Sequence, residues 1–371
     1  LQELSCVADI SRYQARINGS NTALIFEGRE TTYDELDQRA SRIANGLLSG
    51  HCSPGARIGY LGKNSDVYFE LLSGAFKANV AIAGINWRLA APEIDYVLND
   101  AQAEILFVGA EFYDLIEQLV PTLSRVRQII AIDGGHSEWP DFRQWRDSHS
   151  DTDPMLPIDK DDDVVQMYTS GTTGHPKGVQ LTNGNYLDLL DQAANGGWGD
   201  WENGESTIVA MPIFHVAGAN AGVLGLAQGL RNIVIRDVDP VVILDVLEQY
   251  RVRYAFFVPA VILFLNSIPG VRDRDFSNLE TILYGASPIS QDVLSTAQNI
   301  FKCEFCQVYG LTETGGGGTV LLPEDHDPSR GKLLSCGKPA QSSQIRILSR
   351  NGTDAAPNEV GEILYKSGSL M

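Results

Sequence analysis

The chain has 371 residues, which is more than one compact core usually holds, so two or three structural units are expected. Apolar residues make up 43% and charged residues 20%, the proportions of an ordinary globular protein rather than of a disordered one. The formal net charge of −19 repels polyanions and therefore argues against nucleic acid as a partner.

The five cysteines are odd in number and widely spread, which does not resemble a disulfide framework and favours a reducing, cytoplasmic setting. No run of eighteen apolar residues occurs, so no integral membrane segment is expected, and the first ten residues lack the pattern of a secretion signal. Cys303 and Cys306 have metal-ligand spacing, but no second pair and no nearby histidine accompany them, so a structural role is the simpler interpretation.

From residue 56 onward, short apolar runs alternate with segments of helical period, which predicts βαβ units and a parallel sheet. Ser65 is a candidate cap of a helix whose apolar stripe begins at Val67, and Pro92 opens another helix. The stretch 134–163 has no steady period and indicates a surface crossover. The strands expected before this crossover are 57–61, 80–85, 105–108 and 128–132.

A second alternation of the same kind follows the crossover, and from Gly331 it gives way to short strands at 344–348 and 362–366 around the turn-like segment 350–352. The predicted fold is therefore α/β, with two subdomains of βαβ-type sheets packed with helices and the start of a small β-barrel subdomain. The divisions expected are 1–150, 151–330 and 331–371. The strands expected between the crossover and Gly331 are 164–168, 207–211, 232–235, 254–258, 281–284 and 304–308.

The segment most informative about chemistry is the loop 168–178, Tyr-Thr-Ser-Gly-Thr-Thr-Gly-His-Pro-Lys-Gly, which lies between two apolar runs. Hydroxyls and backbone N–H groups donate hydrogen bonds to phosphate oxygens, and the ammonium of Lys177 supplies charge. A Walker A loop would need glycine before this lysine and serine or threonine after it, whereas Pro176 and Gly178 stand there. A merely flexible connection is the alternative, and the Pro-Lys-Gly ending argues against it.

This loop resembles the phosphate-loop signature of the adenylate-forming enzymes, the group that includes acyl-CoA synthetases, firefly-type luciferases and the adenylation domains of peptide synthetases. The resemblance extends over essentially the whole chain, is closest to fatty acyl-CoA synthetases, and implies the fold of their N-terminal large domain. Four further segments resemble motifs of that family in the same order: 211–218 (Met-Pro-Ile-Phe-His-Val-Ala-Gly), 284–288 (Tyr-Gly-Ala-Ser-Pro), 308–314 (Val-Tyr-Gly-Leu-Thr-Glu-Thr) and 361–364 (Gly-Glu-Ile-Leu).

The chemistry that the resemblance implies is attack of a carboxylate on the α-phosphorus of ATP, with loss of pyrophosphate, and then thioester formation with CoA as co-substrate. The chain would thus be an AMP-forming acid–thiol ligase acting on a medium- or long-chain fatty acid. Both reactants are anions, so the protein and Mg²⁺ must neutralise charge as they meet. For Mg²⁺ the resemblance points to Glu313 and to the hydroxyl of Thr169, whose oxygens suit a hard cation.

The catalytic residues implied by the resemblance are Lys177, His215, Thr312 and Glu313. His215 would steer the substrate carboxylate beside an acyl pocket, with a packed histidine at a helix start as the simpler alternative. Small residues in 216–229 leave room for an acyl tail, and the four glycines 315–318 could line the same pocket. The nucleotide-binding set is Thr169, Ser170, Gly171, Thr172, Thr173, Gly174, Lys177, Gly285, Ala286, Ser287, Gln307, Tyr309, Gly310, Leu311 and Thr312.

Three other functions remain open. An aryl-acid or other carboxylate–CoA ligase would differ only in its pocket, an amino-acid-adenylating domain would usually place an aspartate where His215 and Val216 stand, and a non-catalytic nucleotide-binding relative would tend to lose Lys177 or Glu313. The ribose-binding aspartate, hinge and C-terminal lid domain of the family do not appear in the chain, so thioester formation by this chain is expected to be impaired. A homodimer is an assembly that this interpretation allows.

Overall fold

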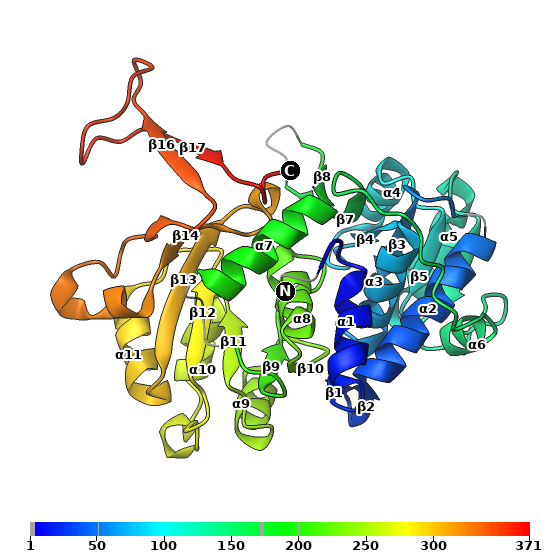
Figure 1. Cartoon of the computed structure of the whole chain (residues 1–371), viewed down its shortest axis with the longest axis horizontal. Helices are drawn as coiled ribbons and strands as arrows, with labels where there is room; N and C mark the ends of the chain where they lie inside the picture. The colour runs from blue at the N-terminus through cyan, green and yellow to red at the C-terminus, as the bar shows by residue number, and fades with distance from the viewer. Residues whose placement is uncertain (1–3, 51, 171–173, 197, 199–200) are drawn as a thin grey trace.

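Two sheets flanked by helices make up most of the molecule and lie side by side in Figure 1. The computed structural model describes residues 4–50, 52–170, 174–196, 198 and 201–371. The α/β class that the alternating pattern predicts is confirmed.

The smaller sheet has six strands in the order β6-β5-β3-β4-β7-β8, all parallel except β8, which runs antiparallel to β7. Helices cover this sheet, so its inner strands β4 and β5 are buried along their whole length and read as continuous apolar runs. The strands are β3 (Arg57–Leu61), β4 (Ala81–Gly84), β5 (Ile105–Val108), β6 (Gln128–Ala131), β7 (Asp163–Thr169) and β8 (Lys177–Thr182).

The larger sheet has nine strands in the order β15-β14-β13-β12-β11-β9-β10-β1-β2. Its central strands are parallel, while β2, β14 and β15 pair antiparallel with their neighbours. The strands are β1 (Thr22–Phe26), β2 (Arg29–Thr32), β9 (Ser206–Val209), β10 (Arg231–Val234), β11 (Tyr254–Phe257), β12 (Thr281–Gly285), β13 (Glu304–Gly310), β14 (Gly318–Leu321) and β15 (Lys338–Pro339).

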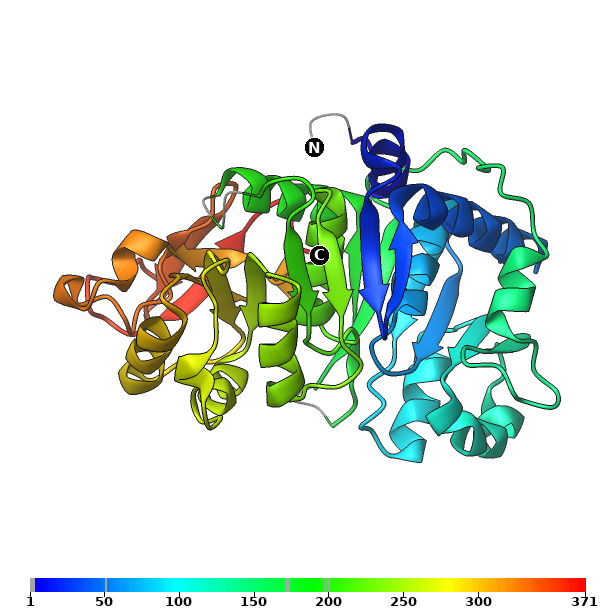
Figure 2. The same cartoon turned by 90° about the horizontal axis from the view of Figure 1, so that it is seen from below.

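The two sheets are not built from consecutive stretches of the chain. Strands β1 and β2 precede the whole smaller sheet in sequence but belong to the larger one (Figure 2). There β1 pairs with β10, with Leu24 opposite Asn232, and β2 pairs with β1. Conversely, β7 and β8 follow the crossover but extend the smaller sheet beyond β4. The boundary expected near residue 150 therefore does not separate the sheets, because pairing between distant segments leaves no local sequence signal.

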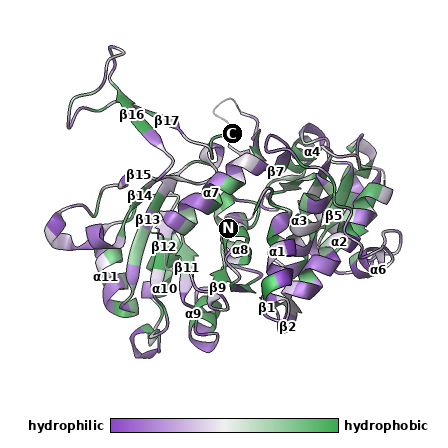
Figure 3. Ribbon diagram, in the orientation of Figure 1, coloured by the Kyte–Doolittle hydropathy of each residue, from purple (hydrophilic) through white to green (hydrophobic). Residues whose placement is uncertain are grey.

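Helices pack on both sheets, and α3 is buried at every residue. Figure 3 shows apolar residues concentrated on the strands and polar residues on the outer helices. None of the helices in the described part of the chain is long and apolar enough to cross a membrane. The helices are α1 (Asp9–Asn18), α2 (Tyr33–Ser49), α3 (Asp66–Ala78), α4 (Ala91–Asp100), α5 (Tyr113–Leu119), α6 (Phe142–Asp147), α7 (Asn183–Asn195), α8 (Val216–Ala227), α9 (Pro240–Gln249), α10 (Pro259–Asn266) and α11 (Gln291–Phe301), with 3₁₀ turns η1 (Ala110–Phe112), η2 (Val120–Thr122), η3 (Val271–Asp273), η4 (Thr312–Thr314), η5 (Pro323–His326) and η6 (Pro328–Arg330).

The segment expected to be an unstructured surface crossover is held to the body more firmly than its composition indicates. It contains the short helix α6, whose Arg146 is buried and donates from Nη1 to Glu70 Oε2 of α3 at 2.6 Å. Further along, Asp153 pairs with the fully buried Lys77 of α3, with 2.8 Å between Nζ and Oδ2. Buried ion pairs of this kind fix geometry, because breaking one leaves an uncompensated charge.

The last segment of the chain forms a hairpin that projects from the body (Figure 1). Strands β16 (Gln344–Leu348) and β17 (Glu362–Lys366) pair antiparallel as a two-stranded sheet, and β15 joins the large sheet instead. The expected alternating strands are therefore present, while the barrel subdomain stays a prediction.

Candidate functional site

The phosphate-loop hairpin, defined as β7, β8 and the loop between them, is paired up to the base of the loop. Thr169 lies opposite Lys177 in the antiparallel register, so both enter the loop at the same level. Gly174 has φ +96°, a conformation open to glycine but strained for other residues. Lys177 is exposed and forms no hydrogen bond or ion pair with the described residues, which leaves its ammonium free for an anion. The predicted ligands that lie outside the described residues are Gly171, Thr172 and Thr173.

Two contacts with α4 anchor the phosphate-loop hairpin. Near the end of β7, Tyr168 donates from its hydroxyl to Asp100 Oδ2 at 2.7 Å. Within the loop, the ring of His175 stacks on Tyr96, with 4.8 Å between centroids and 27° between planes. Sequence reasoning missed Tyr96 and Asp100, because nothing in their local pattern points to a loop so far along the chain.

The pair Thr312 and Glu313, in the turn η4, lies beside the phosphate-loop hairpin. Strand β13 ends at Gly310 and η4 turns the chain, with Thr314 Oγ1 accepting from Leu311 N at 2.9 Å. Strand β8 packs against η4, which brings Lys177 and Glu313 onto adjoining elements. The side chains of Thr312 and Glu313 are half-buried and make no hydrogen bond or ion pair within the described part of the chain. Both polar groups are therefore available to a ligand.

A hollow lies at the carboxyl ends of β12 and β13, where open α/β sheets bind ligands. Gly285 is required here, because a Cβ would collide with the carbonyl oxygen of Val308. Tyr309 is 36% exposed, so its ring can stack on a planar group. The predicted nucleotide ligands that line this hollow are Ala286, Ser287, Gln307, Tyr309, Gly310 and Leu311.

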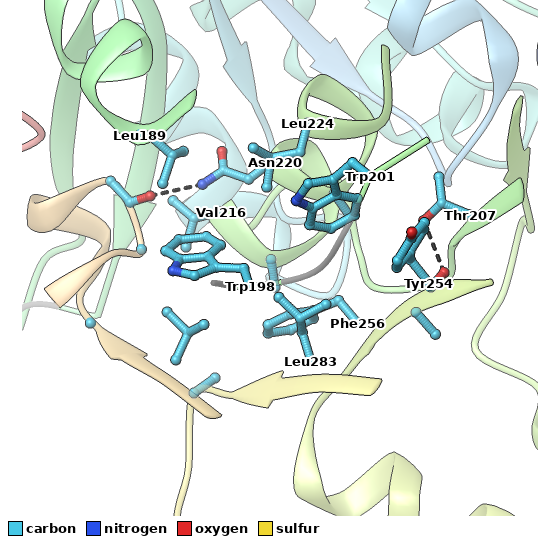
Figure 4. A pocket seen from close by; sticks show the side chains of 18 residues that line it. Leu189, Trp198, Trp201, Thr207, Val216, Asn220, Leu224, Tyr254, Phe256 and Leu283 are labelled. Atoms are coloured by element: carbon cyan, nitrogen blue, oxygen red, sulfur yellow. Dashed lines mark hydrogen bonds between the residues drawn. The ribbon is translucent and has the colours of Figure 1, made fainter. Parts of the chain in front are cut away.

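An apolar pocket adjoins this hollow (Figure 4). It encloses about 810 Å³ of empty space, part of it open to solvent, between α8 and the face of β11 and β12. Ala217 and Ala221 are the small side chains that α8 turns toward it. The pocket and the hollow share Ala286, Val308 and Gly310, so the two spaces meet where β12 and β13 end.

His215 is the residue at which α8 begins, one position before Val216 of the apolar pocket. Its side chain makes no hydrogen bond with the described residues, and its ring lies 4.5 Å from that of Phe214. Part of the ring reaches solvent, yet loss of hydration lowers the pKa of His215, and the positive charge of Arg88 lowers it further. The imidazole is therefore neutral near pH 7.

Arg88 is a residue that sequence reasoning missed. Its guanidinium lies over the ring of Trp87, 4.9 Å from the centroid, and over that of Phe214 at 5.7 Å. No acidic partner contacts it among the residues that the structure describes, so its charge acts on His215 without local compensation.

These side chains suit a Mg²⁺ ion that is held mainly by the phosphate oxygens of a bound nucleotide and only in part by the protein. No group of three or more His, Cys, Asp or Glu side chains within the described ranges could hold a metal ion. Glu313 is a single unpaired carboxylate, and the Thr169 hydroxyl lies at the base of the phosphate loop. Mg²⁺ commonly takes only one or two protein ligands and completes its shell with phosphate oxygens and water.

Comparison with known proteins agrees with this geometry. A fatty acid–[acyl-carrier-protein] ligase, ScoC of Streptomyces coeruleorubidus, is 33% identical over 100% of this chain and 70% of its own length. A feruloyl-CoA synthase of Amycolatopsis sp is 32% identical over 96% of this chain and 69% of its own length. The inhibitor-bound N-terminal domain of FACL13 from Mycobacterium tuberculosis superposes with a TM-score of 0.90 at 26% identity, over 99% of this chain and 90% of that one.

The chain thus spans about seven tenths of the length of these two curated relatives. The family model described as "AMP-binding enzyme" matches residues 11–371. This match, together with a relative of 33% identity along the whole chain, shows that the chain belongs to the AMP-binding enzyme family of adenylate-forming acyl ligases.

Proposed function

We propose that the chain activates a carboxylic acid with ATP, forming an acyl-adenylate and releasing pyrophosphate. The observation that carries the proposal is that the apolar pocket and the hollow at the ends of β12 and β13 share Ala286, Val308 and Gly310 in their linings. Adenylation needs a carboxylate and an α-phosphate at a single point, and an acyl group and a nucleotide held in adjoining spaces satisfy that need.

On this proposal, the polyphosphate lies between the phosphate-loop hairpin and η4. Lys177 neutralises the terminal phosphates, and the hydroxyl of Thr312 donates to the α-phosphate at the junction of the two spaces. Bound by Glu313 and phosphate oxygens, Mg²⁺ would supply the remaining neutralisation of the departing pyrophosphate. The contact between β8 and η4 supports this placement, because it puts a cation and a carboxylate on adjoining elements.

The neutral imidazole of His215 donates a hydrogen bond to the substrate carboxylate without forming an ion pair with it. A protonated imidazole would bind the carboxylate more strongly in the ground state and so reduce its nucleophilicity. The apolar lining behind Val216 excludes water that would hydrolyse the acyl-adenylate.

The acid is fatty or aryl rather than an amino acid. None of the described residues that line the apolar pocket is charged, so an α-ammonium group would be buried among them without a partner. The acceptor we propose for the acyl group is CoA. The phosphopantetheine of a carrier protein is the second candidate, since one relative bears the name of an acyl-carrier-protein ligase and another that of a CoA synthase.

ATP–pyrophosphate exchange with a panel of fatty, aryl and amino acids tests the proposal. Exchange should depend on a fatty or aryl acid, and Lys177→Ala and Glu313→Gln should each lower it about a hundredfold, the scale of losing one charge-stabilising group. Lys160→Ala and Glu362→Gln are matched controls, because both side chains are exposed and lie on other parts of the surface. Undiminished exchange in Lys177→Ala and Glu313→Gln would overturn the residue assignment, and absence of both exchange and acyl-adenylate binding would overturn the function.

A further inference from the structure

The apolar pocket is elongated along the strands of the large sheet. It starts at Ala286 and Gly310, at the carboxyl ends of β12 and β13, and extends to Thr207 and Tyr254, at the amino ends of β9 and β11. In Figure 4 the hydrogen bond of Asn220 marks one side of the pocket, while Trp201, Thr207 and Tyr254 gather at the other. The pocket is therefore a channel that leads from the nucleotide hollow toward Trp201.

Trp201 closes the far end of this channel and is held in place on two sides. Its ring packs on that of Tyr254, with 4.6 Å between centroids and 41° between planes. Its indole Nε1 donates to the carbonyl oxygen of Ala193, near the end of α7, at 3.2 Å. Thr207 Oγ1 donates in turn to Tyr254 O at 3.0 Å, so the residues behind the indole are themselves fixed.

Trp201 is the most exposed of the three side chains at this end of the channel. Tyr254 is 1% exposed and Thr207 is 6% exposed, so both are backed by the core. Trp201 is only half-buried. Loss of the indole would therefore open the channel to water, whereas loss of Tyr254 would leave a cavity inside the protein.

The strand register gives the depth of the channel. Tyr254 lies opposite Thr281 of β12, and Ala286 is five residues further along that strand's path. At roughly 3.3 Å per strand residue this distance is about 16 Å. A fully extended chain covers roughly 1.2 Å per bond, since three backbone bonds span at most about 3.6 Å, so this distance corresponds to roughly thirteen bonds, or an acyl chain of about fourteen carbons.

We propose that Trp201 sets the upper length of the acyl group, and that the substrates are fatty acids of up to about fourteen carbons, or aryl acids of no greater length, rather than longer-chain acids. This inference rests on the proposed function. It narrows the expectation of a medium- or long-chain acid, and it assigns specificity to a residue outside all the motifs.

The test is calorimetric binding of non-hydrolysable acyl-adenylate analogues that differ only in chain length, from roughly six to eighteen carbons. For the wild-type chain, affinity should rise up to about fourteen carbons and fall about tenfold or more at about eighteen, a change of about 1.4 kcal/mol. Trp201→Ala should bind the longest analogue about tenfold more tightly than the wild type, because the chain end passes out through the opened wall. Trp201→Phe should keep the wild-type dependence of affinity on chain length, since a ring still lies at the end of the channel.

Trp139→Ala is the matched control, because that indole stacks on His136 in the other half of the molecule, and it should leave the series unchanged. The inference is overturned if the wild type binds long and medium chains equally, a result that needs no variant to fold, or if Trp201→Ala folds and keeps the wild-type series. Failure of the proposed function looks different, since then no analogue of any length would bind.

Discussion

The four side chains to which the motifs assign catalytic roles share a property at the residue scale. The side chains of Lys177, His215, Thr312 and Glu313 make no hydrogen bond or ion pair with the described residues, although each carries a strong donor or acceptor. Buried polar groups elsewhere are mostly satisfied, as in Lys77, which contacts two carboxylates and a hydroxyl. Unpaired polar side chains of this kind are available to a charged ligand.

The pH at which activity is lost on acidification, the acid limb of the pH profile, should depend on Arg88. Burial lowers the pKa of His215 first, and the charge of Arg88 lowers it further, so the neutral imidazole persists below the ordinary value of 6.5. Activity that needs this neutral form is lost as pH falls through the lowered pKa. Arg88→Gln removes one cause, so the pKa should rise and the activity should be lost at a higher pH than in the wild type.

The pH profile of exchange and NMR titration of the His215 ring measure this effect together. Arg346→Gln serves as the control, because that guanidinium is exposed on the projecting hairpin and pairs with Asp354. An acid limb that stays in place in His215→Asn would show that another group causes it.

At the element scale, the side-chain amide of Asn185 in α7 links the phosphate-loop hairpin to the segment beside η4, the turn that carries Glu313. Asn185 Oδ1 accepts from Thr182 N at 2.9 Å and caps the helix directly after β8. Its Nδ2 donates to the carbonyl oxygens of Gly368 and Leu370, each at 2.9 Å. Met371 N then donates to Glu313 O at 2.9 Å, so Asn185 helps to position the backbone that carries the proposed magnesium ligand.

Asn185→Asp should separate the capping role from the positioning role. The aspartate keeps the acceptor and adds a negative charge at a helix N-terminus, which is stabilising by about 0.5 kcal/mol. It loses both donors and sets a carboxylate against two carbonyl oxygens. We expect the Mg²⁺ concentration for half-maximal exchange to rise several-fold, with a melting temperature close to that of the wild type.

Gln180→Glu is the control for this variant, since it adds the same charge at an exposed position of β8. A drop in melting temperature with unchanged Mg²⁺ dependence would mean that Asn185 only caps the helix.

The sequence was informative where a local pattern reports a local structure. Helix starts such as Pro92 and strand runs such as 105–108 were predicted because caps and apolar periods lie within a few residues of each other. Several residues predicted to bind the nucleotide line one hollow because they end or follow two neighbouring strands, as Tyr309 and Ser287 do. Trp201 was missed, because only the folded sheet brings it over Tyr254.

At the scale of the whole molecule, the proposed site belongs to both sheets. Strand β8 is the last strand of the smaller sheet, and η4 follows β13 of the larger one, so their contact joins the two sheets at the proposed site. The largest core cluster also spans both, from Ala23 of β1 and Ile82 of β4 to Val308 of β13. A shared core holds the two sides of the proposed site in register, which pre-organises it for charged reactants.

A crystal structure of the chain bound to a non-hydrolysable medium-chain acyl-adenylate tests the central claim most directly. The account predicts the adenine against Tyr309 and Ser287, the phosphate surrogate within hydrogen-bonding distance of Thr312, and the acyl chain in the apolar pocket, ending at Trp201. An analogue bound elsewhere, or one whose acyl chain leaves this pocket empty, would contradict it.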